Sequence, residues 1–314
     1  MGARQVLALG SAALGALAAL NSALSTPPPP APPSYGVAGR FRWSEGDIQY
    51  TVSGSGPAVV LVHGIGLAAS SLEMRYVVEP LARACRVYTL DLLGFGHSAR
   101  PRIKYTAGIY VTLIEDFLRE ESGPGAVIAS GLSGAYCLTI AARRPELIQR
   151  LILSSPPPIA RAAPPGAARQ TAGLLLDAPV VGQSMLNVLT ARAGIRTYLR
   201  EQAYYNRDLV TESMVDARYA MAHQPNARYA AQAYMAGRLD LDSSAALAAL
   251  QQPLLLIFGA AAQPAAAASA AAYARLNPRA QILLLERCRL LPHEEQAERF
   301  VEAATAWLTP QTRR

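Results

Sequence analysis

The chain has 314 residues, of which 51% are hydrophobic and 16% are charged, so it can bury one large core and still carry an inserted segment. Its net charge of +7 comes from arginines scattered along the chain, which is typical of a solvated surface and argues against a nucleic-acid partner. The three cysteines are widely spaced, and no His, Cys, Asp or Glu cluster has metal-ligand spacing. We therefore expect no disulfide framework, no metal and no cofactor.

The N-terminus carries an apolar run from Val6 to Leu24, preceded by Arg4. This run predicts that residues 1–25 are a signal peptide or a membrane anchor, because its length approaches the roughly twenty residues that span a bilayer. An alanine-rich helix on a soluble protein is a third interpretation. The positive flank predicts that the N-terminal segment meets a membrane and that the folded domain lies outside the cytoplasm. Residues 26–34 are proline-rich and predict an extended linker.

Residues 35–308, followed by a short tail at 309–314, alternate apolar runs with helical patterns. Apolar and polar residues alternate in two short segments, which predicts a hairpin: Phe41–Trp43 and Ile48–Val52. Six continuous apolar runs are typical of strands buried on both faces: Ala58–Val62, Val87–Leu90, Ala126–Ala129, Leu151–Leu153, Leu254–Phe258 and Ile282–Leu285. Helical patterns separate these runs: Leu72–Ala84, Thr106–Glu120, Leu132–Arg143, Pro264–Leu276 and Glu294–Leu308.

This order predicts an α/β fold, with a mostly parallel eight-stranded sheet flanked by helices. The alternation is interrupted after the sixth strand by a segment at about 156–247, which opens on consecutive prolines and then turns helical. We interpret this segment as a helical lid over the carboxyl edge of the sheet, where ligands bind in open α/β folds.

Four short motifs follow one another along the predicted sheet: Val62–Gly66, Asp91–Ser98, Arg144–Glu146 and Leu291–Glu295. In this order and spacing they resemble the α/β-hydrolase fold superfamily, in the branch that includes epoxide hydrolases and haloperoxidases. The resemblance covers roughly Val59–Leu308. It implies an α/β-hydrolase sheet in which the first motif is the oxyanion loop.

Hydrolysis in this family needs a serine on a tight strand-to-helix turn, a histidine that takes its proton and a carboxylate that orients the histidine. Counting back from Arg144–Glu146, the resemblance places the nucleophile at Gly131. It places the acid at Ala262, after the next-to-last strand, and the base at Leu290, just before the last motif. We therefore predict that the Ser-Asp-His triad is absent and that the chain is inactive as a serine hydrolase.

Displaced residues leave an alternative open. Ser133 could serve as nucleophile in a shifted register of the turn, and Ser130 is a second serine beside it. His293 could serve as base, although a histidine that only begins the last helix is the other interpretation.

The loops that would frame the reaction are still present. The resemblance implies a pocket built by His63, Gly64, Ile65, Gly66, Ser130 and Leu132. The amides of Ile65 and Leu132 would remain as hydrogen-bond donors. Because the three triad positions hold apolar residues, such a pocket suits an apolar small molecule with a carbonyl or carboxylate group.

Three functions are consistent with these patterns. The first is a non-catalytic α/β-hydrolase-fold protein that binds an apolar small molecule or acts as a membrane-tethered interaction module. The alternative is an active serine hydrolase, of the esterase or epoxide-hydrolase type, that uses a displaced nucleophile such as Ser133. The third is a structural subunit whose lid packs against a protein partner.

Overall fold

The computed structural model describes residues 30–159, 173, 176–262 and 266–308, together with residues 15, 19 and 21. Nearly all of the predicted signal peptide or anchor (1–25), most of the linker (26–34), the tail (309–314) and Pro264 lie outside the described residues. Within the described part of the chain, no helix has the length and apolar character needed to cross a membrane.

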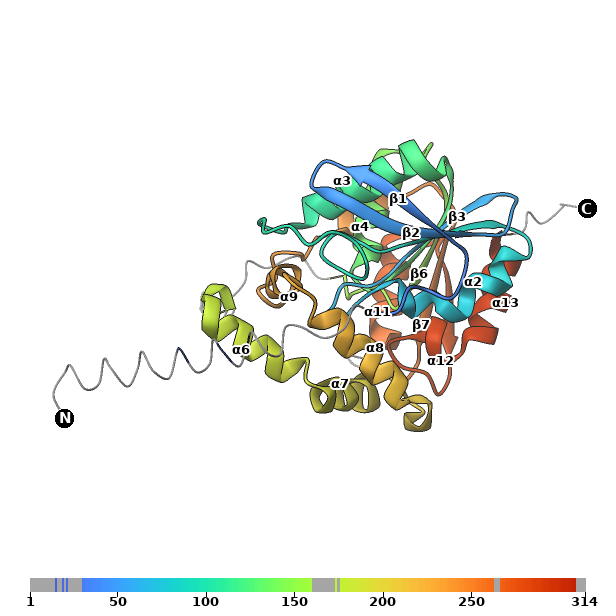
Figure 1. Cartoon of the computed structure of the whole chain (residues 1–314). Helices are drawn as coiled ribbons and strands as arrows, with labels where there is room; N and C mark the ends of the chain where they lie inside the picture. The colour runs from blue at the N-terminus through green and yellow to red at the C-terminus, as the bar shows by residue number, and fades with distance from the viewer. Residues whose placement is uncertain are drawn as a thin grey trace, which may run out of the picture.

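An eight-stranded sheet forms the centre of the molecule (Figure 1). Its order is β1-β2-β4-β3-β5-β6-β7-β8, with antiparallel pairs β1–β2 and β2–β4 and parallel pairs elsewhere. This confirms the predicted mostly parallel eight-stranded sheet. The strands are β1 (Val37–Trp43), β2 (Gly46–Ser53), β3 (Ala58–Val62), β4 (Arg86–Leu90), β5 (Gly125–Ser130), β6 (Ile148–Ser154), β7 (Leu254–Gly259) and β8 (Gln281–Leu285).

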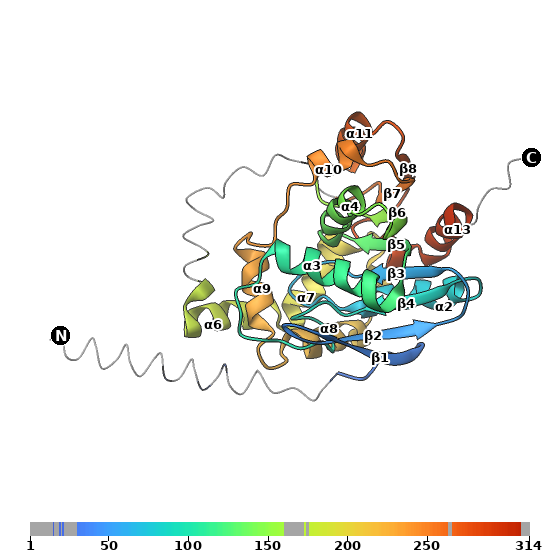
Figure 2. The same ribbon diagram turned by 90° about the horizontal axis from the view of Figure 1, so that it is seen from above.

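Helices flank the sheet on both faces: η1 (Ser71–Met74), α2 (Arg75–Ala82), α3 (Ala107–Phe117), η2 (Leu118–Ser122), α4 (Ser133–Arg143), α11 (Ala266–Leu276), α12 (Pro292–Glu295) and α13 (Ala297–Leu308). Successive strand residues alternate between two apolar clusters because side chains on a strand point to opposite faces. On β3, Val60 and Val62 belong to the cluster with α3 and α4, whereas Val59 and Leu61 belong to the cluster with α2 and α13. Figure 2 shows the resulting layers on either side of the sheet.

The chain between β6 and β7 forms a helical insertion: α6 (Pro179–Leu189), α7 (Arg192–Tyr198), η3 (Leu199–Ala203), η4 (Arg207–Leu209), α8 (Glu212–Ala222), α9 (Arg228–Met235) and α10 (Ser244–Ala249). Helices α6 to α9 gather at one end of the sheet (Figure 1). Part of the insertion has a small apolar cluster of its own, which includes Ile195, Leu199, Tyr204 and Val215.

Two predicted helices are divided in the structure. The segment predicted at Leu72–Ala84 begins as the 3-10 helix η1 and continues as α2. The segment predicted at Glu294–Leu308 begins earlier, at Pro292, and breaks at Gln296, whose backbone leaves the helical conformation. The Gln296 side chain donates instead to the Glu286 carbonyl at 2.6 Å, which ties this break to the loop after β8.

Candidate functional site

The turn between β5 and α4 has a glycine at its apex. Gly131 follows Ser130, the last residue of β5, and has a φ of +50°. A positive φ costs a residue with a Cβ about 1 to 2 kcal/mol, which is the strain that a nucleophile elbow carries. A Cβ built on Gly131 would meet the Cα of Gly64 at 3.8 Å, an ordinary contact, so a side chain would have room here. The turn therefore has the form of an elbow and presents only a hydrogen.

The other two positions that the sequence predicts for the triad carry apolar side chains. Leu290 lines the same cavity as Gly131, and its amide donates to the Ala203 carbonyl of the insertion at 3.1 Å. Ala262 follows β7 and is buried in the larger apolar cluster. Neither an isobutyl nor a methyl group can take a proton or orient an imidazole, so these two residues supply no base and no acid.

The displaced candidates are both fully buried and have different partners. Ser133 Oγ donates to the carbonyl of His63 at 2.6 Å. His293 Nδ1 lies 2.8 Å from Ser154 Oγ, and its Nε2 lies 3.6 Å from Glu73 Oε1. Ser133 and His293 therefore do not bond to each other in the structure. Each is hydrogen-bonded to a different part of the sheet domain.

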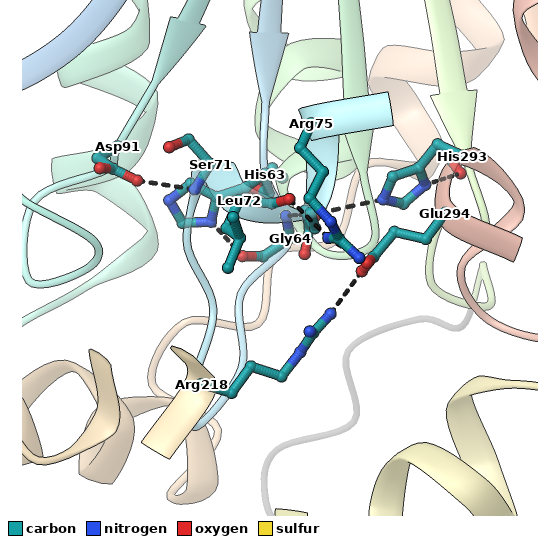
Figure 3. Close-up of polar contacts among 12 residues, drawn as sticks. His63, Gly64, Ser71, Leu72, Arg75, Asp91, Arg218, His293 and Glu294 are labelled. Atoms are coloured by element: carbon teal, nitrogen blue, oxygen red, sulfur yellow. Dashed lines mark hydrogen bonds and ion pairs between the residues drawn. The ribbon is translucent and has the colours of Figure 1, made fainter. Parts of the chain in front are cut away.

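The loop after β3 is held by hydrogen bonds to the turn after β4. The Leu92 amide donates to His63 Nε2 at 3.0 Å. The carboxylate of Asp91 accepts from the amides of Ser71 and His97 at 2.7 and 2.9 Å. His63 is thus a fully buried residue that orients the loop, and Asp91 organises two turns around it (Figure 3).

A cavity of about 1030 Å³ lies between the carboxyl edge of the sheet and the insertion. Five of the six predicted pocket residues line it: Gly64, Ile65, Gly66, Ser130 and Leu132. The insertion contributes apolar residues that include Val188, Leu189, Ile195 and Tyr198, and the floor includes Gly131 and Leu290. Apolar surface predominates in the lining, and the charged side chains in it are Glu73, Arg218 and Asp240.

A carboxylate that the sequence did not single out lies in this wall. Glu73, in η1, lines the cavity, and its Oε1 accepts from the Gly64 amide at 2.6 Å. Burial alone would raise its pKa, but the neighbouring His293 and His63 and the Gly64 amide outweigh burial and lower it to about 2. Glu73 is therefore ionised at neutral pH and is too weak a base to accept a proton in catalysis.

A second buried carboxylate joins the insertion to the sheet domain. Glu294 is held between two arginines, with Arg75 Nη1 and Arg218 Nη2 each 2.5 Å from one of its oxygens. Tyr204 Oη donates to the same carboxylate at 2.9 Å. Arg218 comes from α8 and also lines the cavity, so this cluster fixes one wall of the site (Figure 3).

The arrangement of side chains in the described residues also bears on metal binding. Over the described residues, no group of three His, Cys, Asp or Glu side chains is arranged to hold a metal ion. The three cysteines are not joined in disulfides, and burial raises the pKa of Cys137 to about 12, which makes that thiol inert.

Comparison with known proteins connects this geometry to a family. The family described as "Alpha/beta hydrolase family" matches residues 59–303. The 2-hydroxy-6-oxo-6-(2'-aminophenyl)hexa-2,4-dienoic acid hydrolase of Metapseudomonas resinovorans is 27% identical over 192 residues, which cover 60% of this chain and 61% of that protein. The 2-hydroxymuconate semialdehyde hydrolase of Pseudomonas sp. strain CF600 is 32% identical over 32% of this chain and 37% of its own length. The chain thus spans less than two thirds of these relatives.

A solved structure of a serine hydrolase involved in carbazole degradation superposes on this fold with a TM-score of 0.71. The two chains are 22% identical, and the match covers 87% of this chain and 99% of the other. At this identity the likeness establishes the fold and leaves the activity to be argued from the site.

Proposed function

The chain belongs to the alpha/beta hydrolase family, and we propose that it binds an apolar small molecule without hydrolysing it through a serine nucleophile. The observation that carries the proposal is the apex of the turn after β5, where Gly131 has a φ of +50° and no side chain. Loss of the nucleophile alone costs about 10⁶ in turnover in a serine protease, and the losses of the other triad members add little beyond it.

The cavity supports a binding role. Its volume of about 1030 Å³ is at the upper end of the range for small-molecule sites, roughly 300–1,000 Å³. Its floor and the walls contributed by the insertion are largely apolar, so burial of an apolar ligand would provide the driving force. Ile65 and Leu132 offer backbone amides at the position where a hydrolase would hold an oxyanion.

Thermal denaturation with candidate ligands tests this function. Aliphatic alcohols and isoprenoids should raise the melting temperature in proportion to the logarithm of their concentration, because a ligand that binds only the folded state stabilises it. The ligand should be recovered chemically unchanged after incubation. Failure of every apolar ligand to shift the transition would contradict binding, and recovery of hydrolysed ester would contradict the absence of turnover.

An active hydrolase is the second candidate, because the relatives named above are hydrolases and Ser130 lines the cavity. In this reading Ser130 or Ser133 replaces the missing nucleophile. Turnover of p-nitrophenyl esters that is lost in Ser130→Ala or Ser133→Ala, with the fold intact, would establish it.

We also propose that the protein works at a membrane surface. The apolar run Val6–Leu24 suggests a tether, and α6 presents an exposed apolar stripe at helical spacing: Val181, Met185, Val188 and Leu189. Val188 and Leu189 also line the cavity, so the stripe borders its mouth. Co-sedimentation of the full chain with lipid vesicles should weaken when Val181 and Met185 are replaced by Asp, since this removes apolar surface from the bilayer contact.

A further inference from the structure

We propose that the cavity selects ligands whose head group donates a hydrogen bond, such as a hydroxyl or an ammonium group, and that Glu73 makes this selection. The inference rests on the proposed binding function and names the ligand class for it. It replaces the carboxylate-bearing ligand that the sequence suggested.

Glu73 lies at the part of the cavity where a ligand head group would sit. A Cβ built on Gly64 would lie 3.5 Å from Glu73 Oε1 and 3.4 Å from Ser130 Oγ. A Cβ built on Gly131 would in turn lie 3.8 Å from the Cα of Gly64. The carboxylate and the Ser130 hydroxyl therefore both adjoin Gly64, the residue that faces the apex of the turn, and apolar residues such as Leu132 and Leu290 line the cavity with them.

The charge of this carboxylate determines what can lie beside it. His293 and the Gly64 amide hold Glu73 in its ionised form, as its pKa of about 2 indicates. Its Oε1 is already bonded to the Gly64 amide, and no contact recorded among the described residues occupies Oε2. A ligand carboxylate beside Gly64 would place two like charges near each other in a site largely closed to water, which is unfavourable. A hydroxyl or ammonium donor would instead satisfy the carboxylate.

Arg218, the cationic side chain in the same wall, does not reverse this preference. Its Nη2 is bound to Glu294 at 2.5 Å, while its Nη1 is buried without a hydrogen-bond partner among the described residues. Glu294 is shared by Arg75, Arg218 and the Tyr204 hydroxyl, and Glu73 is a second negative charge that acts on Arg218, so the two arginines face two carboxylates. Glu73 is the charged side chain that lies beside Gly64, and Asp240 in the same lining adds a further negative charge, so the cavity disfavours a ligand carboxylate.

Calorimetric titration of the full chain with four ligands built on a decyl or decanoyl chain tests the inference: 1-decanol, decylamine, methyl decanoate and decanoate. The four share one apolar tail and differ in whether the head group donates, only accepts or carries a negative charge. The alcohol and the amine should bind at least about tenfold more tightly than decanoate, which is about 1.4 kcal/mol. Methyl decanoate should bind more weakly than the alcohol, because it cannot donate to Glu73.

Two variants that each remove one negative charge distinguish an effect of charge in the cavity from an effect of charge elsewhere on the protein. In Glu73→Gln, which can still accept from the Gly64 amide, the gap between decanol and decanoate should shrink at least about tenfold. In Glu79→Gln, an exposed residue on α2, the gap should not change.

Decanoate binding as tightly as decanol in the unmodified protein would overturn the inference and would indicate Arg218 as the group that meets the ligand. An unchanged gap in a folded Glu73→Gln variant would also overturn it. If the Glu73→Gln variant does not fold, the order in which the unmodified protein binds the four ligands still tests the inference. If none of the four ligands binds, the proposed binding function fails, and this inference falls with it.

Discussion

Ser133 Oγ donates a 2.6 Å hydrogen bond to the main-chain carbonyl of His63, and this bond joins the first turn of α4 to the loop after β3. Both residues are fully buried. A serine that holds two loops together in this way contributes to the shape of the cavity floor. Its hydroxyl is engaged with a backbone acceptor rather than with an imidazole, which supports the proposal that it is not a nucleophile.

The first prediction concerns this bond. Ser133→Ala should lower the free energy of unfolding by about 1 to 3 kcal/mol, because it leaves a buried carbonyl without its donor. Urea denaturation measures the change. The exposed Ser55 provides the control, and Ser55→Ala should change stability by no more than about 0.5 kcal/mol. A Ser133→Ala protein of unchanged stability that had lost ester turnover would identify Ser133 as a nucleophile instead.

The second prediction concerns the apex glycine. Gly131→Ser should fold with a loss of about 1 to 2 kcal/mol, because the side chain fits the space but the φ of +50° is unfavourable. It should gain no ester turnover, since Leu290 provides no base. In Gly131→Ser/Leu290→His, which returns a serine and an imidazole to the lining of one cavity, turnover of p-nitrophenyl acetate should become measurable. Turnover in Gly131→Ser alone would show that another base, such as His293, already reaches the apex.

The third prediction is a pH dependence. The folded-state pKa of Glu73, about 2, lies below its ordinary value of 4.5, so the ionised form is the one that stabilises the fold. This contribution, about 1 to 3 kcal/mol, is fully present above about pH 4.5 and is lost as the pH falls toward 2. Unfolding experiments between pH 6 and pH 3 should show a shallower loss in Glu73→Gln than in the unmodified protein. Equal slopes in the two proteins would contradict the environment assigned to this carboxylate.

The fourth prediction compares a buried ion cluster with an exposed pair. Glu294→Ala should cost about 3 to 5 kcal/mol, because it leaves Arg75 and Arg218 buried near each other without a counter-charge. Glu201→Ala, which removes the partner of Arg207 on the exposed surface of the insertion, should cost about 0 to 1 kcal/mol. Similar costs for the two variants, measured by urea denaturation, would show that Glu294 does not fasten the insertion to α12.

Much of the fold could be predicted from the sequence because it depends on local patterns. A short continuous apolar run such as Ala58–Val62 is typical of a strand that is covered on both faces. The strand β3 spans those same residues. The helix after β5 could be predicted in the same way, because the helical pattern at Leu132–Arg143 differs by one residue from α4, which spans Ser133–Arg143.

The polar part of the cavity could not be predicted in this way. Glu73 and His293 are distant in sequence and meet only after the sheet has formed. Glu294, Arg75 and Arg218 likewise come from three separate segments. In the sequence, each of these residues looks like a charged or polar side chain on the exposed face of a helix. Their roles arise from tertiary contacts, for which the sequence offers no spacing rule.

Labelling with a fluorophosphonate, which reacts with activated serine nucleophiles, tests the central claim most directly. The folded full chain should show no adduct by intact-protein mass spectrometry, because the apex holds Gly131 and Ser133 is bonded to His63. A stoichiometric adduct that maps to Ser130, Ser133 or Ser154 would contradict the claim and show a working nucleophile.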